Sequence, residues 1–361
     1  MQFSNCIPVK GFGRTAFYDV QRNRYIFSTN NFSNILSSKK NKIPIDKIDD
    51  DFKAHLDTLV SDGWGIYINK LAADLFPKLD LSWHSFSTIT NAQIDLNNNE
   101  ADMANFIEVV IPQFEKLICK YYQINFLQPI SFKKISSFLR SFDDTGVSAL
   151  NLVLPYLYIS TEELTTLFET QPRLQSLFFY SCPITEHNIP RKNKIFYSQN
   201  DINIRFENNI LTDYFTTNIF FFSESQNHNC YYNRKLCIDV DGNIKNSPEH
   251  ERTFGNVKNT ALADSVKTPG FQDLWFIHKE IIDVCKVCEF RHMCVDACVP
   301  LQRKDGTWFR SKECNYNPYI CKWKGEEGYK TLAESGVICN RKGLNIDEKE
   351  LTNINVKIWG E

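Results

Sequence analysis

The sequence predicts an α/β fold in three parts: a small module of strands and helices, a central parallel sheet of the partial α/β-barrel type, and an irregular cysteine-rich C-terminal region. Two observations carry this prediction. Strand and helix patterns alternate over residues 81–225, and such a βαβα rhythm is typical of parallel sheets with crossover helices. Six of the twelve cysteines lie between residues 285 and 321, after the alternation has ended.

The first part, residues 1–80, has short apolar stretches separated by glycine and asparagine, followed by helical patterns. These stretches predict a small meander of strands around Ile7, Phe17 and Ile26. One helix is expected at Phe32, and a second over residues 46–60, where the aspartates 49–51 form a charge cluster at the N-terminus of the helix. Residues 64–68 are expected to form a closing strand. The whole pattern predicts a winged-helix-like module.

The second part, residues 81–225, is expected to hold the parallel sheet. Ser160 and Glu163 have the spacing of a capping box and predict a helix start. The expected strands are 92–96, 121–127, 149–156, 175–180 and 219–222, and the expected helices include 102–119 and 132–142. The third part, residues 226–361, loses the alternation, and a helix over 271–284 is expected to deliver Cys285 to a metal.

Composition excludes several classes of protein. The formal net charge is −2 and no basic run is interleaved with aromatics, which argues against a nucleic-acid binder. The first residues resemble no signal peptide, and no apolar run approaches the roughly 20 residues that span a membrane. We therefore expect a cytoplasmic protein without a membrane partner. Thiols stay reduced in that compartment, so the cysteines favour metal over disulfides.

The cysteines form a constellation with one Cys-x2-Cys knuckle and longer, unequal gaps. Its members are Cys285, Cys288, Cys294, Cys298, Cys314 and Cys321, with Cys230 and Cys237 upstream. A zinc ribbon would show two such knuckles, whereas a cluster needs thiolates from several directions. The pattern favours a [4Fe–4S] cluster; zinc, or a site that no longer binds metal, are the alternatives. Cys6, Cys119, Cys182 and Cys339 are expected to be structural.

With the motifs Cys237-Ile238-Asp239-Val240-Asp241-Gly242 and Cys314-Asn315-Tyr316-Asn317-Pro318, the constellation resembles the SPASM domain over about residues 230–323. SPASM domains are the auxiliary cluster-binding extensions of many peptide-modifying radical SAM enzymes. The whole chain more narrowly resembles the peptide maturase of grasp-with-spasm systems. There, an ATP-grasp ligase and this protein jointly modify a ribosomally made precursor peptide.

The resemblance implies that Cys285, Cys288, Cys294 and Cys314 hold one [4Fe–4S] cluster. It implies that Cys298 reaches back to another cluster, together with Cys230 and Cys237. That other cluster lacks a ligand, because Ser247 stands where the SPASM pattern has cysteine. It is absent, incomplete, or completed by Cys321 or a non-cysteine group.

The chemistry of a radical SAM enzyme is missing. Its Cys-x3-Cys-x2-Cys motif occurs nowhere in the chain, and Asn97-Asn98-Asn99 follows the first expected strand of the sheet. A phosphate-binding Gly-rich loop is also missing. Asp95 is favoured as a plain strand-end carboxylate, and His292 stands out because it lies between expected cluster ligands. No catalytic residue is assigned.

Two functions from different classes remain. In the first, residues 1–80 resemble a PqqD-like recognition element, which adds a precursor peptide as an extra strand. The partner ligase then forms side-chain ester or amide crosslinks. In the second, the chain is a redox enzyme whose cluster serves an oxidative step on a peptide. We favour the first, because no organic cofactor site or activated nucleophile is visible in the sequence.

Overall fold

The computed structural model describes residues 3–38, 48–69, 72–75, 77–183, 194–202, 210, 212 and 215–360. The chain forms two compact units with interleaved segments. The first comprises Met1–Trp83, Asn208–Tyr231 and Phe276–Glu361, and the second comprises His84–Glu207 and Tyr232–Trp275.

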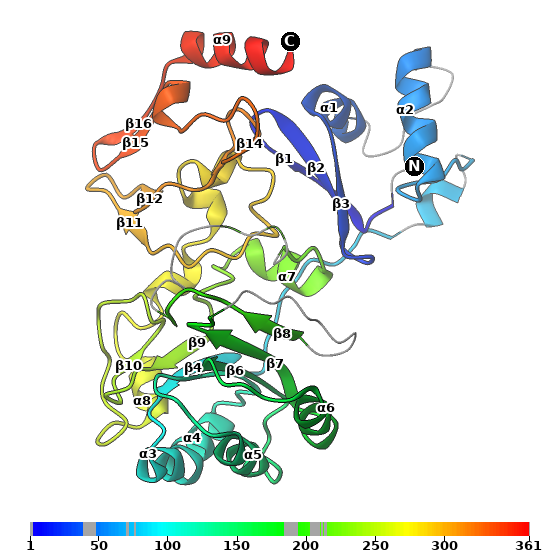
Figure 1. The fold of residues 1–361 in the computed structure, drawn as a ribbon. Coiled ribbons are helices and arrows are strands. Elements are labelled where there is room, and N and C mark those ends of the chain that lie inside the picture. The colour runs from blue at the N-terminus through cyan, green and yellow to red at the C-terminus, as the bar shows by residue number, and fades with distance from the viewer. Residues whose placement is uncertain are drawn as a thin grey trace. The chain divides into compact units, whose positions relative to one another are not determined.

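The second unit is built on a seven-stranded sheet in the order β10-β9-β4-β5-β6-β7-β8 (Figure 1). Neighbours from β9 to β8 run parallel, and β10 pairs antiparallel with β9. The strands are β4 (Asn91–Leu96), β5 (Tyr121–Phe126), β6 (Ala149–Pro155), β7 (Leu174–Tyr180), β8 (Lys194–Tyr197), β9 (Lys235–Ile238) and β10 (Ile244–Lys245). The predicted mixed α/β fold with a mostly parallel sheet is confirmed. Residues 232–275 add β9 and β10 to it, although their pattern had placed them in the C-terminal region.

Strands β4 to β8 are neighbours in chain order, as in a partial barrel. Since parallel crossovers are right-handed, successive crossovers in one direction place their helices on one face. Figure 1 shows α3, α4, α5 and α6 on that side of the sheet. They are α3 (Glu100–Asn105), α4 (Ile111–Lys116), α5 (Phe132–Arg140) and α6 (Thr161–Thr170), and α8 (Leu262–Lys267) packs against α4. The main core lies here, with Ile124 and Leu152 fully buried. Ser160 and Glu163 form the predicted capping box of α6.

The predicted helix over 102–119 is interrupted by a wider turn. Between α3 and α4 lies a π-helical segment, Phe106–Val110, in which the Ile111 N–H donates to the Phe106 carbonyl. Pro112 follows directly. It has no N–H for an ordinary helical bond and its ring clashes with the carbonyl four residues before it. A π turn accommodates this proline without ending the helix.

The first unit contains a three-stranded antiparallel sheet, β1-β2-β3, packed on both faces. Its elements are β1 (Cys6–Lys10), β2 (Arg14–Asp19), β3 (Arg24–Thr29), α1 (Asn30–Ser38) and α2 (Asp50–Ser61). Phe17 faces α1 and α2, whereas Tyr18 faces the cysteine-rich segment. The Asp49 side chain caps α2 by accepting from the Phe52 N–H, as the charge cluster predicted. The expected start at residue 46 lies outside the described residues.

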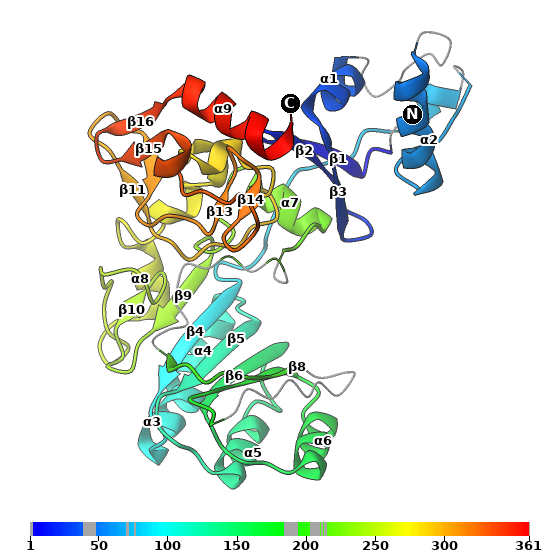
Figure 2. The same ribbon diagram turned by 45° about the horizontal axis from the view of Figure 1, so that its top comes forward.

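The cysteine-rich part of this unit consists of short hairpins and turns (Figure 2). The hairpins are β11 (Pro300–Gln302) with β12 (Trp308–Arg310), β13 (Tyr316–Asn317) with β14 (Lys322–Trp323), and β15 (Val337–Asn340) with β16 (Gly343–Ile346). Helix α9 (Glu348–Trp359) follows, and α7 (Ile219–Ser225) comes from an earlier segment. The expected irregular region is therefore held by local hairpins, turns and side-chain contacts.

Three expected elements are wrong. Residues 219–222 begin α7 and not a strand, because the Asn218 side chain accepts from the Phe221 N–H and starts a helix. Residues 271–284 form short 3₁₀ turns, Asp273–Phe276 and Lys279–Ile281, and no continuous helix. Between the two turns, the Ile277 carbonyl accepts a hydrogen bond from the Asn229 side chain. Residues 64–68 form no strand; the Trp64 carbonyl accepts from the Phe3 N–H.

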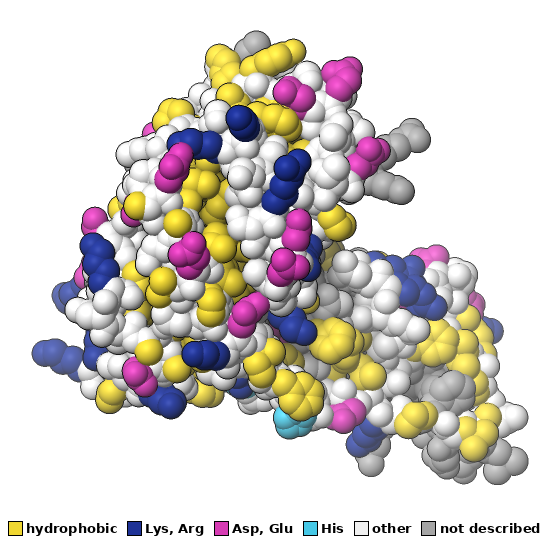
Figure 3. Space-filling model, turned by 90° about the horizontal axis from the view of Figure 1, so that it is seen from below, with side chains coloured by type: hydrophobic (Ala, Val, Ile, Leu, Met, Phe, Trp, Pro, Cys, Tyr) yellow, Lys and Arg dark blue, Asp and Glu magenta, His cyan; other side chains and the backbone are white. Residues whose placement is uncertain are grey.

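Among the described residues, no helix combines the length and the apolar character that crossing a bilayer requires. On the face shown in Figure 3, Lys and Arg side chains are interspersed with Asp and Glu.

Candidate functional site

The Cys-x2-Cys knuckle is formed by a tight 3₁₀ turn. Cys285 begins the turn Cys285–Val287, and the Cys288 N–H donates to the Cys285 carbonyl at 3.0 Å. Val284, just before it, has a φ of +70°, a conformation that costs a β-branched residue energy. A second turn brings the Cys294 N–H to the Phe290 carbonyl at 3.0 Å. Local backbone bonds therefore set the course of the chain at three cysteines.

Several cysteines of the first unit lie within electrostatic reach of one another. The pKa of Cys285 is raised to about 11, mainly by burial; the charges of Lys279 and Arg310 lower it, and those of Asp296 and Cys314 raise it. Burial likewise raises the pKa of Cys294 to about 12, again with Cys314 and Cys285 contributing. Burial raises the pKa of Cys288, and the negative charges of Glu289, Cys294 and Cys285 also raise it. We call Cys285, Cys288, Cys294 and Cys314 the cysteine group.

Two largely buried cations, with side chains 13% and 7% exposed, lie beside the cysteine group. Lys279 and Arg310 both pair with Asp296, each at 3.2 Å. Their own pKa values are lowered by burial, but Asp296 and the neighbouring cysteines outweigh that effect and raise them. Two cations facing one carboxylate leave a positive charge to be balanced. Thiolates bound to a metal would supply the matching negative charge.

The donor chemistry of the cysteine group therefore fits a thiolate-bound metal centre. Soft sulfur ligands select iron–sulfur clusters and zinc. The charges of Lys279 and Arg310 lower the pKa of Cys285, although burial outweighs them. In the part of the chain that the structure describes, no set of three or more His, Cys, Asp or Glu side chains is arranged to hold one metal ion. The fit rests on donor type, burial and charge.

The structure places the other candidate cysteines differently. Burial raises the pKa of Cys230; the charges of Glu224 and Cys294 also raise this pKa, and that of Lys279 lowers it. Cys230 therefore neighbours the cysteine group. Cys298 is buried with its Sγ 3.2 Å from the Ser311 Oγ, and it acts on the pKa of Arg310. Cys237 lies on β9 in the second unit.

Cys321 has a structural contact that no sequence pattern indicated. A Cβ added at Gly13 would lie 2.7 Å from the Cys321 Sγ, so the sulfur rests against the β1–β2 turn. Cys321 itself has a φ of +52°. Its place beside this turn explains why position 13 needs glycine.

The N-terminal sheet is fastened to the knuckle, which the sequence did not reveal. The Tyr18 hydroxyl donates to the Glu289 carbonyl at 2.6 Å, and the Arg14 Nε pairs with the Glu289 carboxylate at 2.6 Å. The Phe12 N–H donates to the Val287 carbonyl at 2.8 Å. Glu289 is fully buried and also accepts from the Tyr316 hydroxyl. The strands and the cysteine-rich segment therefore share one packed interface.

One edge of this sheet is closed. Backbone hydrogen bonds join Gly11 to Arg14 and Val20 to Asn5. Along β1 and β2, residues whose backbone groups bond to the other strand therefore alternate with residues whose backbone groups point away from it. By that alternation, Pro8 and Lys10 direct their backbone groups away from β2. Pro8 has no N–H to offer, and the Lys10 carbonyl accepts from the Arg291 guanidinium at 2.8 Å. Proline and a blocked carbonyl protect an edge from pairing.

The other edge is unpaired among the described residues. The same alternation points the backbone groups of Thr15, Phe17 and Asp19 toward β3, and those of Tyr25 and Phe27 away from β2. Within the described residues, the N–H and C=O groups of Tyr25 and Phe27 have no hydrogen-bond partner. Phe27 is 38% exposed. We call the outer side of Tyr25–Phe27 the β3 edge.

His292 takes part in a chain that resembles a nucleophile triad. Its Nδ1 lies 2.9 Å from the Ser225 Oγ, and its Nε2 lies 3.1 Å from a Glu280 carboxylate oxygen. However, the Ser225 side chain is buried, and its hydroxyl donates to the Phe222 carbonyl at 2.7 Å. A nucleophile needs a free approach for its substrate. The chain of bonds therefore joins α7 through His292 to the 3₁₀ turn Lys279–Ile281.

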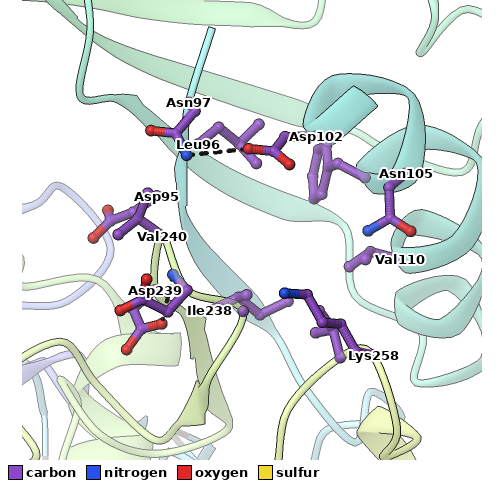
Figure 4. A pocket seen from close by; sticks show the side chains of 14 residues that line it. Asp95, Leu96, Asn97, Asp102, Asn105, Val110, Ile238, Asp239, Val240 and Lys258 are labelled. Carbon is purple, nitrogen blue, oxygen red and sulfur yellow. Dashed lines mark hydrogen bonds between the residues drawn. The ribbon is translucent and has the colours of Figure 1, made fainter. Parts of the chain in front are cut away.

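A cavity of about 380 Å³ lies at the carboxyl ends of β4 and β9 in the second unit. Figure 4 shows Asp95, Asp102, Asp239 and Lys258 around it. Asp95 accepts from Asn125 at 2.6 Å, and Asp239 pairs with Lys245 at 3.2 Å. The Asn97 amide donates to Asp102. These carboxylates are engaged within the fold, consistent with the structural role favoured for Asp95.

A scan against protein-family models finds no match for this chain, and a search of the curated proteins also finds none.

Proposed function

We propose that this chain is an iron–sulfur maturation protein that binds a ribosomal precursor peptide in the cytoplasm and presents it to an ATP-grasp ligase. The observation that carries the proposal is the β3 edge, an unpaired strand side that lies next to the cysteine group. Strand addition to such an edge uses main-chain bonds for affinity and side-chain pockets for register.

The N-terminal strands and helices support peptide recognition. We interpret residues 1–80 as a winged-helix-like recognition module, whose sheet has one closed and one open edge. The Ser28 Oγ lies 3.1 Å from the His55 Nε2, so α2 approaches β3 on one face. Phe290 approaches on the other face. A peptide strand at the β3 edge would place alternate side chains toward these two walls.

The cysteine group supports a SPASM-like metal domain with one [4Fe–4S] cluster, or zinc as the alternative. When bound, such a centre supplies structural crosslinking of its thiolates and, if it contains iron, a reservoir for single electrons. The residues of this chain do the rest: Lys279 and Arg310 balance the charge, and Glu289 with Phe290 joins the knuckle to the sheet. The ligase would form the ester or amide crosslink.

The test begins with a selection. Phage-displayed random 20-residue peptides are selected on the full chain, purified without oxygen and loaded with iron and sulfide. A selected peptide is then labelled with fluorescein, and its affinity is measured by anisotropy. The proposal expects Tyr25→Pro to weaken binding roughly fivefold, because it removes an outward N–H and one hydrogen bond is worth about 1 kcal/mol.

The matched control is Tyr25→Ala, which removes the same ring and keeps the N–H. Equal affinity of both variants would mean that the peptide does not pair with the β3 edge. Chemical modification of the peptide by the loaded chain alone, without a ligase, would favour the redox enzyme over the maturation scaffold.

A further inference from the structure

Phe290 lies between the cysteine group and the β3 edge. It is buried within the loop from Cys288 to Cys294. Its ring centroid lies 6.0 Å from that of Tyr25 and 5.6 Å from that of Phe27, both in edge-to-face arrangements. These are the two residues whose backbone forms the β3 edge. One side chain therefore contacts the whole edge and sits two residues from a candidate ligand.

The loop around Phe290 is short and internally bonded. The Arg291 N–H donates to the Cys288 carbonyl at 3.2 Å, and the Met293 and Cys294 N–H groups both donate to the Phe290 carbonyl at 3.0 Å. The Phe290 backbone is therefore linked to both cysteines by single turns. A backbone displacement at Cys288 or Cys294 therefore shifts the ring that supports Tyr25 and Phe27.

The ring has no room to move independently. It also packs against Tyr316 at 4.9 Å, Phe215 at 5.0 Å and Trp323 at 5.5 Å between centroids. Close-packed cores transmit displacements instead of absorbing them. On the sheet side, Arg14 stacks 3.5 Å over the Phe27 ring while pairing with Glu289. The edge and the loop are thus joined at two adjacent points.

We propose that Phe290 is a positioning residue through which metal loading of the cysteine group strengthens peptide binding at the β3 edge. This inference rests on the proposed function. Metal fixes the loop between Cys288 and Cys294, and the loop then holds the edge in the conformation that pairs with a strand. The apparent affinity for peptide scales with the fraction of molecules in that conformation.

The experiment compares peptide affinity of the metal-free and the loaded full chain, with the selected fluorescein-labelled peptide as the probe. Metal-free protein is prepared with a chelator, and loading uses iron with sulfide and, separately, zinc. We expect loaded protein to bind at least tenfold more tightly. In Phe290→Ala, metal content stays the same but the loaded and metal-free affinities differ by less than twofold. Phe290→Leu, which keeps part of the packing, restores part of the difference.

The matched control is Phe309→Ala. Phe309 is a buried aromatic on β12 that packs under Arg303 and makes no ring contact with the N-terminal sheet in the described residues. Its variant should keep the tenfold dependence on metal. If Phe309→Ala abolishes the dependence as well, general loosening of the unit explains the effect, and the role of Phe290 is refuted.

A second measurement covers a Phe290 variant that fails to load metal. Coupling is reciprocal, so in the wild-type protein the peptide must tighten metal binding by the same factor by which metal tightens peptide binding. Hydrogen exchange at the Ile26 and Ser28 amides, which face β2 in the ladder, should also slow when metal is added. Equal peptide affinity with and without metal overturns the coupling and leaves the β3 edge standing. Failure of the loaded protein to bind any selected peptide overturns the proposed function itself.

Discussion

Replacing Glu289 with glutamine should destabilise the first unit through the loss of one buried charge. Glu289 is fully buried and pairs with Arg14 at 2.6 Å, while the Arg14 side chain keeps 24% of its exposure. Removing one partner of a buried ion pair costs about 3–5 kcal/mol, since the other charge stays buried alone. Because water reaches part of Arg14, we expect the free energy of unfolding to fall by about 2–3 kcal/mol.

The assay is urea unfolding of the full chain at neutral pH, followed by tryptophan fluorescence, since Trp323 packs in the same core. A double-mutant cycle with Arg14→Met isolates the pair and should give a coupling energy of at least about 1 kcal/mol. The control is Arg22→Met. Arg22 is 48% exposed and shares Asp19 with Arg24, so its loss should destabilise the protein less than the loss of Glu289.

A coupling energy near zero would refute the reasoning. It would mean that Arg14 and Glu289 do not depend on each other. The N-terminal sheet would then be held to the knuckle by apolar packing alone.

Three further outcomes are expected. Cys288→Ala should lower the bound metal measured by elemental analysis and reduce the melting temperature, because metal binding is coupled to folding in such domains. The control is Cys339→Ala. Unchanged metal content in Cys288→Ala would mean that Cys288 is not a ligand. Gly13→Ala should destabilise the protein by about 1–3 kcal/mol through overpacking against the Cys321 sulfur. Adding Cys321→Ala should relieve the overpacking with no loss of metal. Additive effects of the two substitutions on the free energy of unfolding in a urea titration would contradict the contact. Burial raises the pKa of Asp19, but hydrogen bonds from Arg22, Arg24 and Asn5 outweigh it and place the pKa below the ordinary value of 3.8. The stabilisation by ionised Asp19 is therefore complete above about pH 4 and is lost as pH falls through the folded pKa. Asp19→Asn should flatten the acid limb of a curve of unfolding free energy against pH. An unchanged acid limb would argue against the pairing of Asp19 with Arg22 and Arg24.

Local patterns predicted most of the parallel sheet. Each strand from β4 to β7 has alternating or continuous apolar residues, and the helix after β6 starts at a capping box whose two members are three positions apart. Such signals depend on neighbours in sequence, so a single chain displays them. The prediction of a strand at residues 219–222 was wrong because four consecutive apolar residues fit a buried strand and a short helix equally well. The side chain of Asn218 decided between them.

At the site, the metal centre stays a prediction from the sequence. The spacing of Cys285, Cys288 and Cys294 indicated a metal knuckle from sequence alone. The attachment of that knuckle to β2 could not be inferred, because Tyr18 and Glu289 lie 271 positions apart and neither belongs to a motif. The open state of the β3 edge was equally hidden, since it depends on the register of three strands and on Arg291 closing the opposite side.

The pairing of β1–β3 with the knuckle also has a bearing on biosynthesis. The hairpin that carries Tyr18 leaves the ribosome long before Glu289 does. At roughly 5–20 residues per second, the wait is on the order of tens of seconds. During that time the Tyr18 face of the sheet lacks the knuckle and can pack only against earlier segments of its cluster, such as Leu79 and Phe222. The rest of its apolar surface is open to chaperones or to a second nascent copy. The expressed yield of this protein should therefore respond to translation rate and to chaperone supply more strongly than that of a protein whose N-terminal module closes on itself.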